Sequence, residues 1–373
     1  MRKNLWAALL ALALLAAAGC GNDQREAGED SRTEQKEGTR VVTDALGRQV
    51  ELPETVETFV ALGNTPRMIS YLGLAEKAAG VGGMEADRIT PLTVYAYVNR
   101  ELWQDLPRVG TDAAGNTDYY PEAILSARPD VILCTYTEDM AEDLEEKTGL
   151  PVVAVGQGTV FEEDYEQSLR ILGEVCGVSE RAEEVIAYIR DSLADLHERI
   201  EEIPEKEKPS VLSAAATFKG IHGIEGVNLK SPVLDALSAD NAAAESAVGE
   251  AAAAEVDREQ ILSWDPDIIF CDYGGVALVR QDARENPEYY RQLQAFREGR
   301  IYQHPSSTSY FANLELSLAN CYYIGSILYP ETFSDIDPGE KANEIIEFFL
   351  GAEDYMTVLN EYGAGYGPVD FGE

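Results

Sequence analysis

The chain has 373 residues, and at roughly 100–200 residues per domain this length favours two domains. Its hydrophobic content of 45 % is sufficient for sizeable cores, whereas a formal net charge of −38 argues against nucleic acid or a polybasic membrane patch as partners. The chain has only three His, in separate regions, so no clustered His and carboxylate set predicts a directly bound metal.

The first residues indicate export from the cytoplasm. Arg2 and Lys3 precede an apolar run over 5–18, which is typical of a secretory signal and too short for an ordinary membrane span. The run ends in LAAAGC, which resembles the bacterial lipobox. The resemblance implies a signal peptide over 1–19 and a lipid anchor on Cys20, with an uncleaved anchor helix as the alternative.

The rest of the chain divides into a tether and two lobes. Residues 20–39 include almost no apolar side chains, so we predict a flexible tether. Strand and helix signals then alternate, which is typical of parallel sheets flanked by helices. We therefore predict an N-terminal α/β lobe over 40–178, a connecting helix over 179–203, and a C-terminal α/β lobe with C-terminal helices over 204–373.

Nine segments carry this alternation. The sequence predicts strands or helices in the first lobe at 57–62, 66–74, 78–83, 138–149 and 151–156, and in the second at 209–217, 231–239, 287–296 and 299–305. Near the end of the chain, helical patterns occupy 310–330 and 337–351, and we expect the Gly- and Tyr-rich tail at 360–373 to be irregular.

One short stretch occurs twice in similar form, as EAILSARPDVILCTY at 122–136 and EQILSWDPDIIFCDY at 259–273. In each copy a short helical segment stops at a proline, and the continuous apolar run that follows is typical of a strand buried on both faces. Pro121 suits the first helical position in one copy, and Asp257 with Gln260 form a plausible capping box in the other. The repeat therefore predicts equivalent elements in two Rossmann-like lobes with mainly parallel sheets.

A single helix is expected to join the lobes. Ser179 can cap it, Pro204 closes it, and apolar residues recur between them at three- and four-residue spacing. These residues are Ala182, Val185, Ile186, Ile189, Leu193, Leu196, Ile200 and Ile203. About 24 residues at 1.5 Å each would span about 36 Å, so we expect a stiff connector and little relative motion of the lobes.

Four cysteines besides Cys20 have no C-x-x-C spacing that would signal a zinc or redox site. Buried free thiols are the simplest expectation for Cys134, Cys176, Cys271 and Cys321. A disulfide remains an alternative in an exported protein, because the sequence does not pair them.

The order of these segments resembles the substrate-binding lipoproteins of ABC importers for iron–siderophore, haem and corrinoid complexes, which have two α/β lobes bridged by one long helix. The resemblance covers roughly 41–363 and rests on VTDALGRQVELPETVETFVALG, DLPRVGTDAAGNTDYYPEAILSARPDVIL and DREQILSWDPDIIF. It implies a lipid-anchored monomer on the outer face of the cytoplasmic membrane, working with a permease and an ATPase. It also implies that Glu122 and Glu259 dock on Arg side chains of the permease. The alternative is that both only stabilise a first helical turn.

Ligands of open parallel sheets bind beyond the carboxyl ends of the strands. On this basis and from nearby loops, we predict ligand contacts by Asn64, Arg67, Tyr95, Tyr97, Tyr119, Tyr136, Lys219, His222, Tyr273 and Tyr310. The segment SSTSYF at 306–311, with Phe311, also follows a predicted strand and is expected beside the ligand. We expect Tyr136 and Tyr273 to face one common cavity, and His304 to be a packed loop residue.

The aromatic content of this set fits flat or apolar ligands such as porphyrins, corrins and catecholate chelates. The sequence therefore favours capture of an iron complex of the siderophore type, with the metal arriving inside its chelate and no resident cofactor. Haem or corrinoid binding, and a two-lobed lipoprotein sensor without an importer, are the alternatives. No catalytic motif such as G-x-S-x-G, a P-loop or H-E-x-x-H occurs, so we do not expect an enzyme.

Overall fold

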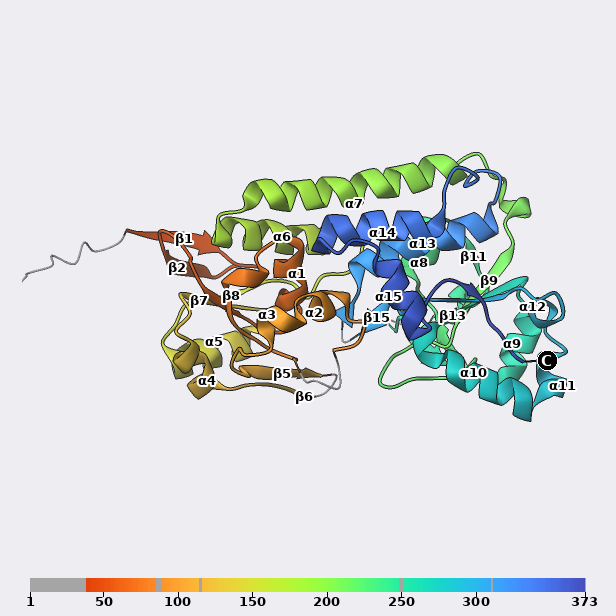
Figure 1. The fold of residues 1–373 in the computed structure, drawn as a ribbon, viewed down its shortest axis with the longest axis horizontal. Coiled ribbons are helices and arrows are strands. Elements are labelled where there is room, and N and C mark those ends of the chain that lie inside the picture. Colours follow the sequence, from red (N-terminus) through yellow and green to blue (C-terminus); the bar gives the residue numbers. More distant parts are fainter. Residues whose placement is uncertain (1–37, 85–88, 114–115, 248–250, 310, 373) are drawn as a thin grey trace, which may run out of the picture. The chain divides into compact units, whose positions relative to one another are not determined.

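The computed structural model describes residues 38–84, 89–113, 116–247, 251–309 and 311–372 (Figure 1). The predictions for the signal peptide, Cys20 and Tyr310 fall outside these residues. The first strand, β1 (Thr39–Thr43), begins close to the predicted start of the folded part. Within the described ranges, every helix is too short or too polar to cross a membrane.

The N-terminal lobe is built on a four-stranded parallel sheet in the order β4-β3-β7-β8. Its strands are β3 (Phe59–Ala61), β4 (Ala78–Val81), β7 (Val131–Cys134) and β8 (Val152–Ala154). Helices α1 (Thr65–Tyr71), α4 (Pro121–Ala127), α5 (Glu138–Thr148) and α6 (Glu163–Cys176) accompany it. Strands β3, β7 and β8 are buried throughout, which explains their continuous apolar sequences. Two hairpins flank the sheet: β1 with β2 (Gln49–Pro53), and β5 (Gly110–Ala113) with β6 (Asn116–Tyr119).

The C-terminal lobe has a seven-stranded mixed sheet with the path β12-β10-β9-β13-β14-β17, and β11 pairs with β9 off this path. Strands β11, β9, β13 and β14 pair in parallel, while β10, β12 and β17 are antiparallel to their neighbours. The strands are β9 (Ser210–Ala214), β10 (Gly226–Asn228), β11 (Asp240–Asn241), β12 (Ala253–Glu255), β13 (Ile268–Asp272), β14 (Ile301–His304) and β17 (Gly367–Pro368). The α/β class with mainly parallel sheets in two lobes is thus confirmed.

The helices of this lobe include those predicted, but the helix Tyr273–Glu285 was not predicted and the single segment expected at 287–296 forms two short helices. They are α8 (Pro232–Ala236), α9 (Arg258–Trp264), α10 (Tyr273–Glu285), α11 (Pro287–Tyr290), α12 (Gln294–Arg297), α13 (Leu314–Leu328), α14 (Pro338–Leu350) and α15 (Tyr355–Tyr362). The prediction of an irregular tail was wrong in part, because α15 extends into it and β17 pairs with β14. The Gln303 side chain fixes this segment by donating to the carbonyls of Gly363 and Gly365, both at 3.0 Å.

The repeated sequence forms the same element in both lobes. Helix α4 leads into β7, and α9 leads into β13; each helix has seven residues and ends at a left-handed residue, Arg128 (φ 53°) or Asp265 (φ 38°). Pro121 is the first helical residue, as predicted. The capping box was wrong: Asp257 is the N-cap, but the amide of Gln260 donates to the Asp257 backbone carbonyl (2.9 Å) and the side chain caps nothing.

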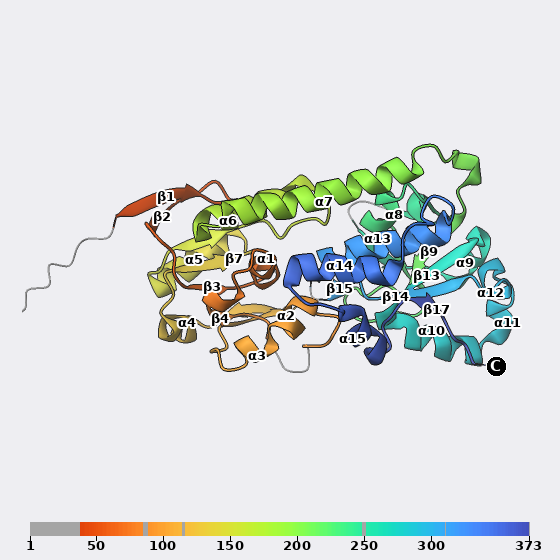
Figure 2. The same ribbon diagram turned by 45° about the horizontal axis from the view of Figure 1, so that its top comes forward.

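The connecting helix α7 (Ser179–Ile200) runs alongside elements of both lobes and packs on α6, α8 and α13 (Figures 1 and 2). Ser179 is its first residue rather than its cap, since the carbonyl of Val178 accepts the hydrogen bond from the Ala182 amide (3.1 Å). The helix also ends three residues earlier than expected, because the amide of Ile203 turns back to the carbonyl of Ile200 (3.0 Å).

The lobes share one apolar core besides their connector. A single cluster of buried side chains includes Met68 of α1, Val185 of α7, Tyr322 of α13 and Phe349 of α14. Because the cluster crosses from one lobe to the other, relative motion of the lobes would expose apolar surface. This packing supports the expectation that the lobes move little.

All four described cysteines are free and buried, as the simplest reading of the sequence expected. Burial raises the thiol pKa of Cys134, Cys176 and Cys271 to about 12 and raises that of Cys321 as well. These thiols are therefore protonated packing groups rather than reactive ones.

Candidate functional site

A cavity of about 330 Å³ receives residues from both lobes. The N-terminal lobe contributes the loop that follows β8, at 157–160, and the C-terminal lobe contributes the ends of β9, β13 and β14 together with residues of α8 and α13. The carboxyl ends of parallel strands thus form one wall, as expected for open α/β sheets. The volume is at the lower end of the range of about 300–1,000 Å³ usual for small-molecule sites.

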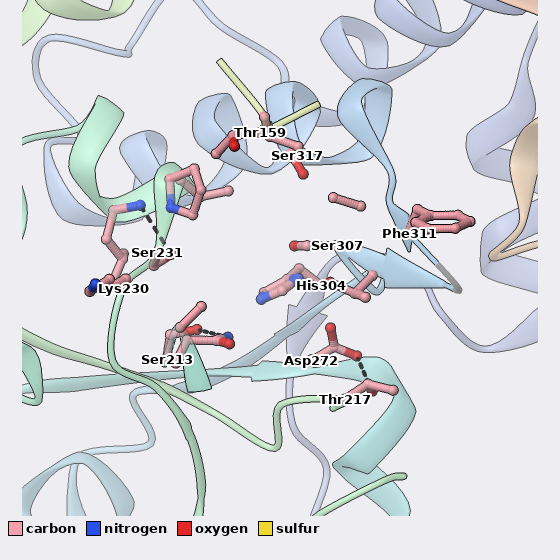
Figure 3. Close-up of a pocket in the computed structure, with 18 of the residues that line it drawn as sticks. Thr159, Ser213, Thr217, Lys230, Ser231, Asp272, His304, Ser307, Phe311 and Ser317 are labelled. Carbon is pink, nitrogen blue, oxygen red and sulfur yellow. Dashed lines mark hydrogen bonds between the residues drawn. The ribbon is translucent and has the colours of Figure 1, made fainter. Parts of the chain in front are cut away.

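Hydroxyl groups dominate the polar part of the lining. They belong to Thr308 and to Thr159, Ser213, Thr217, Ser231, Ser307 and Ser317. All of these except Thr308 are labelled around the cavity in Figure 3. Lys230 adds a cation, and Phe311 is the one benzenoid ring among the lining residues described. The hydroxyl groups and Lys230 therefore suit oxygen atoms of a ligand, while apolar side chains such as Val233, Leu234 and Ile324 form much of the rest of the lining.

Asp272 shapes the wall where β13 ends. Its side chain is buried and caps α10 by accepting a hydrogen bond from the Gly274 amide (2.9 Å). The Ser306 hydroxyl also donates to it, and the Thr217 hydroxyl lies 3.5 Å away. Burial raises the pKa of Asp272, against the opposing effects of His304 and these donors. All three of these contacts are made with Oδ1, so Asp272 fixes the strand end through one oxygen atom and also lines the cavity.

His304 is buried, as expected for a packed residue, but it also lines the cavity. Its Nδ1 lies 2.8 Å from the carbonyl of Pro305, which can only accept, so Nδ1 carries the proton. The Asn320 amide, 3.1 Å from Nδ1, donates to that carbonyl and to Ser307 Oγ. Burial lowers the pKa of His304, so the ring is neutral at neutral pH and Nε2 presents a lone pair.

Three predicted ligand residues lie at a buried polar junction between the lobes instead of in the cavity. Arg67 of α1 is fully buried and donates to Asn64 Oδ1 (2.5 Å) and, across the lobes, to Asn313 Oδ1 (2.9 Å). Its guanidinium lies 4.7 Å from the centre of the Tyr95 ring. The guanidinium therefore links the two lobes. Burying its charge without these partners would cost several kcal/mol of folding free energy, on the order expected for an unpaired buried charge.

A carboxylate completes this junction. Glu315, in the first turn of α13, is fully buried and accepts a hydrogen bond from the Tyr71 hydroxyl. Burial raises the pKa of Glu315, although Arg67 and Tyr71 act to lower it. Asn313 also donates to the carbonyl of Leu92 in the N-terminal lobe (3.0 Å) and to that of Ser306 beside the cavity (3.0 Å). The junction thus connects α1 to one wall of the cavity.

Two predicted tyrosines belong to the core of the N-terminal lobe. Tyr119 and Tyr136 are both buried, with ring centres 6.1 Å apart. The Tyr119 hydroxyl donates to Asp143, and the Tyr136 hydroxyl donates to Asp112 (3.1 Å). Neither ring lines the cavity, because each hydroxyl is held by a carboxylate of its own lobe.

The tyrosines predicted elsewhere also serve packing. Tyr97 lies under the guanidinium of Arg100, 4.1 Å from the ring centre, and the Tyr273 hydroxyl donates to the carbonyl of Tyr362 (2.9 Å). Tyr273 does not line the cavity, so the expected common cavity for Tyr136 and Tyr273 is not formed.

Two further predicted ligand residues, Lys219 and His222, lie outside the cavity as well. Lys219 is exposed in a turn with φ of 49°. His222 has both ring nitrogens engaged, Nδ1 with Glu255 (2.9 Å) and Nε2 with the carbonyl of Phe218 (2.8 Å), and its ring stacks on Phe218. This arrangement orders the turn and leaves neither nitrogen for a ligand.

The two predicted docking residues occupy matching exposed positions. Glu122 is the second residue of α4, and Glu259 is the second residue of α9. Neither carboxylate forms an ion pair with the part of the chain that the structure describes. Both are therefore accessible to a partner, and their docking role remains a prediction.

Sequence reasoning identified one part of the cavity and missed the rest. The segment 306–311, SSTSYF, was expected beyond a strand end, and its Ser307, Thr308 and Phe311 line the cavity. Thr217, which follows β9, was missed although it has the same kind of position. No such signal marks Ser317, because a serine inside an apolar helical pattern resembles a packing residue. No group of three or more His, Cys, Asp or Glu among the described residues is arranged to hold a metal ion.

Comparison with known proteins agrees with this architecture. The family model described as "Periplasmic binding protein" matches residues 53–308. The chain therefore belongs to the periplasmic binding protein family, as a substrate-binding protein of the ABC-transporter class.

Individual relatives are distant but cover most of the chain. The ABC transporter substrate-binding lipoprotein YvrC of Bacillus subtilis is 25 % identical over 342 residues, which are 90 % of this chain and 99 % of YvrC. A periplasmic solute binding protein from Veillonella parvula has a TM-score of 0.69 at 22 % identity and covers 87 % of this chain and 98 % of its own. The molybdate-binding protein MolA of Haemophilus influenzae has a TM-score of 0.63 at 19 % identity, covering 84 % and 98 %. The two structures share the fold.

Proposed function

We propose that this protein captures an iron complex of the siderophore type in the cavity between its lobes and delivers it to an ABC permease. The main support for this proposal is the cavity, which is lined by a loop of the N-terminal lobe and by the strand ends of the C-terminal lobe. Cys20, outside the described residues, would hold the protein by lipid at the outer face of the cytoplasmic membrane.

The lining supports a hydrophilic chelate rather than haem or a corrinoid. Hydroxyl donors and the Lys230 ammonium suit carboxylate, hydroxamate or catecholate oxygen atoms, and Phe311 is the one benzenoid ring among the lining residues that the structure describes. The Nε2 lone pair of His304 suits either a ligand hydroxyl or an open coordination position on the metal.

A small oxyanion is a second candidate, favoured by the same Lys230 and hydroxyl groups. MolA, whose fold this chain shares, binds molybdate. Oxyanions are recognised in proteins by several short hydrogen bonds from neutral donors and by cations, and this lining offers both.

Calorimetric titration of the purified protein tests these possibilities. The panel is ferric citrate, a ferric hydroxamate, a ferric catecholate, haem, cyanocobalamin and molybdate. We expect at least one ferric chelate to bind with a Kd of about 1 µM or tighter, which corresponds to about −8 kcal/mol. Binding of molybdate, haem or cyanocobalamin in its place would reject the iron-complex assignment.

Import is tested separately from ligand choice. Stimulation of a permease–ATPase complex by the loaded protein would support delivery. A protein that binds its ligand but engages no permease would instead act as a two-lobed sensor.

A further inference from the structure

The duplicated element places more than a carboxylate on the surface of each lobe. In α4, Glu122 is followed three residues later by Leu125, and in α9 Glu259 is followed at the same distance by Leu262. Residues three apart are neighbours on a helix surface. Between them Ile124 and Ile261, both fully buried, fix the same helix face against each lobe.

The leucines are not buried as the isoleucines are. Leu125 is 45 % exposed, which makes it one of eight large hydrophobic residues exposed in the described part of the chain. Tyr120, the N-cap of α4, is another of the eight, at 36 %. Two of these eight side chains thus lie close to Glu122 in the sequence, and the Tyr120 hydroxyl is hydrogen-bonded to Thr111 of β5 (3.0 Å), so Leu125 is the one of the two whose side chain forms no hydrogen bond.

The second copy has the same geometry with less apolar surface. Leu262 is half-buried and packs against the core of the C-terminal lobe, and Asp257 stands where α4 has Tyr120. Both helices have seven residues, end at a left-handed residue before a proline, and lead into a buried strand. The Glu–Leu pairs are therefore held rigidly, one on each lobe.

We propose that Leu125 and Leu262 are apolar docking contacts for the permease, so that each lobe binds through a Glu–Leu pair and not through a carboxylate alone. This inference rests on the proposed delivery function. The partner would present two sockets, each with a guanidinium beside an apolar wall. An exposed ion pair alone contributes only about 0–1 kcal/mol, and an adjacent apolar contact that excludes water makes such a pair more effective.

The chain offers a matched control for the more exposed pair. Leu102, on α3 (Arg100–Trp103) of the same lobe, is also 45 % exposed. Leu125→Ser and Leu102→Ser therefore remove equal side chains of equal exposure from two places on one lobe. Leu125→Met keeps the apolar surface and serves as the conservative variant.

The experiment measures docking of ligand-free protein on the permease–ATPase complex in nanodiscs, together with ATPase stimulation. Because the assay contains no ligand, an error in the ligand assignment does not affect the measured docking. We expect Leu125→Ser to raise the docking Kd about tenfold and Leu262→Ser about threefold, as partial loss of a buried leucine predicts. Leu125→Met and Leu102→Ser should stay within about twofold of wild type. Thermal melting should be unchanged for the variants of the exposed Leu125 and Leu102, whereas Leu262→Ser should lower it, because Leu262 packs against the core.

Two results would overturn the inference. If Leu125→Ser and Leu102→Ser dock equally well while Glu122→Gln with Glu259→Gln abolishes docking, delivery stands and the apolar contact is absent. If the wild-type protein docks on no permease complex, both this inference and the delivery function fail.

Discussion

Replacing Arg67 with methionine should strongly destabilise the protein without changing any residue that lines the cavity. The guanidinium is fully buried and donates to Asn64 and Asn313, and it faces the buried carboxylate of Glu315. Removing one partner of a buried charged pair usually costs about 3–5 kcal/mol, because the other charge stays buried without compensation. That is a large share of a typical unfolding free energy of about 5–15 kcal/mol.

The pH dependence of this loss follows from Glu315. Burial already raises its pKa in the folded state, and without Arg67 the pKa rises further. A carboxyl group whose folded pKa is raised stabilises most below its ordinary pKa of about 4.3, and this contribution disappears as pH rises through the folded pKa. The loss of unfolding free energy caused by Arg67→Met should therefore be larger at about pH 7.5 than at about pH 5.

Urea denaturation at both pH values, followed by circular dichroism, measures this loss. The double variant Arg67→Met with Glu315→Gln should recover about 2 kcal/mol relative to Arg67→Met, since no uncompensated charge remains. Arg291→Met, at an exposed arginine, is the control and should change stability by less than about 0.5 kcal/mol. An additive double variant with a pH-independent loss would refute the assigned role of the junction.

Three further outcomes are expected. Glu122→Ala with Glu259→Ala should abolish uptake in a transport assay while calorimetry shows unchanged ligand affinity; reduced affinity would mean that their role is misassigned. Ser317→Leu should weaken ligand binding by about 100-fold by filling the cavity, whereas Ser317→Ala should change it by less than about tenfold. Gly325→Ala should lower unfolding free energy by about 1–3 kcal/mol, because a Cβ there would lie 2.5 Å from the buried Phe333 ring; an unchanged melting temperature would contradict this.

The fold could be predicted because its elements repeat a local pattern. Buried parallel strands such as β7 and β13 are continuous apolar runs, and Pro121 marks the start of a helix by its chemistry alone. The caps at Ser179 and Asp257 could not be predicted as reliably, because backbone carbonyls competed for the same amides.

The binding residues were harder to predict because one side chain type serves several purposes. A tyrosine just beyond a strand, such as Tyr136, suits a ligand or a lobe core equally well, and only the position of Asp112 decides between them. Arg67 shows the same problem for charge, since its partner Asn313 lies 246 residues away. Small hydroxyl residues such as Thr159 carry no sequence signal that separates a cavity wall from an ordinary turn.

The four buried cysteines make this protein a convenient scaffold for a fluorescent reporter. Thiols with a pKa of about 12, such as Cys134, Cys176 and Cys271, supply almost no thiolate at neutral pH, so maleimide dyes would leave them unmodified. A cysteine introduced at the rim of the cavity in the leaderless, unlipidated chain would then be the one site of attachment. A dye placed there would convert ligand capture directly into an optical signal.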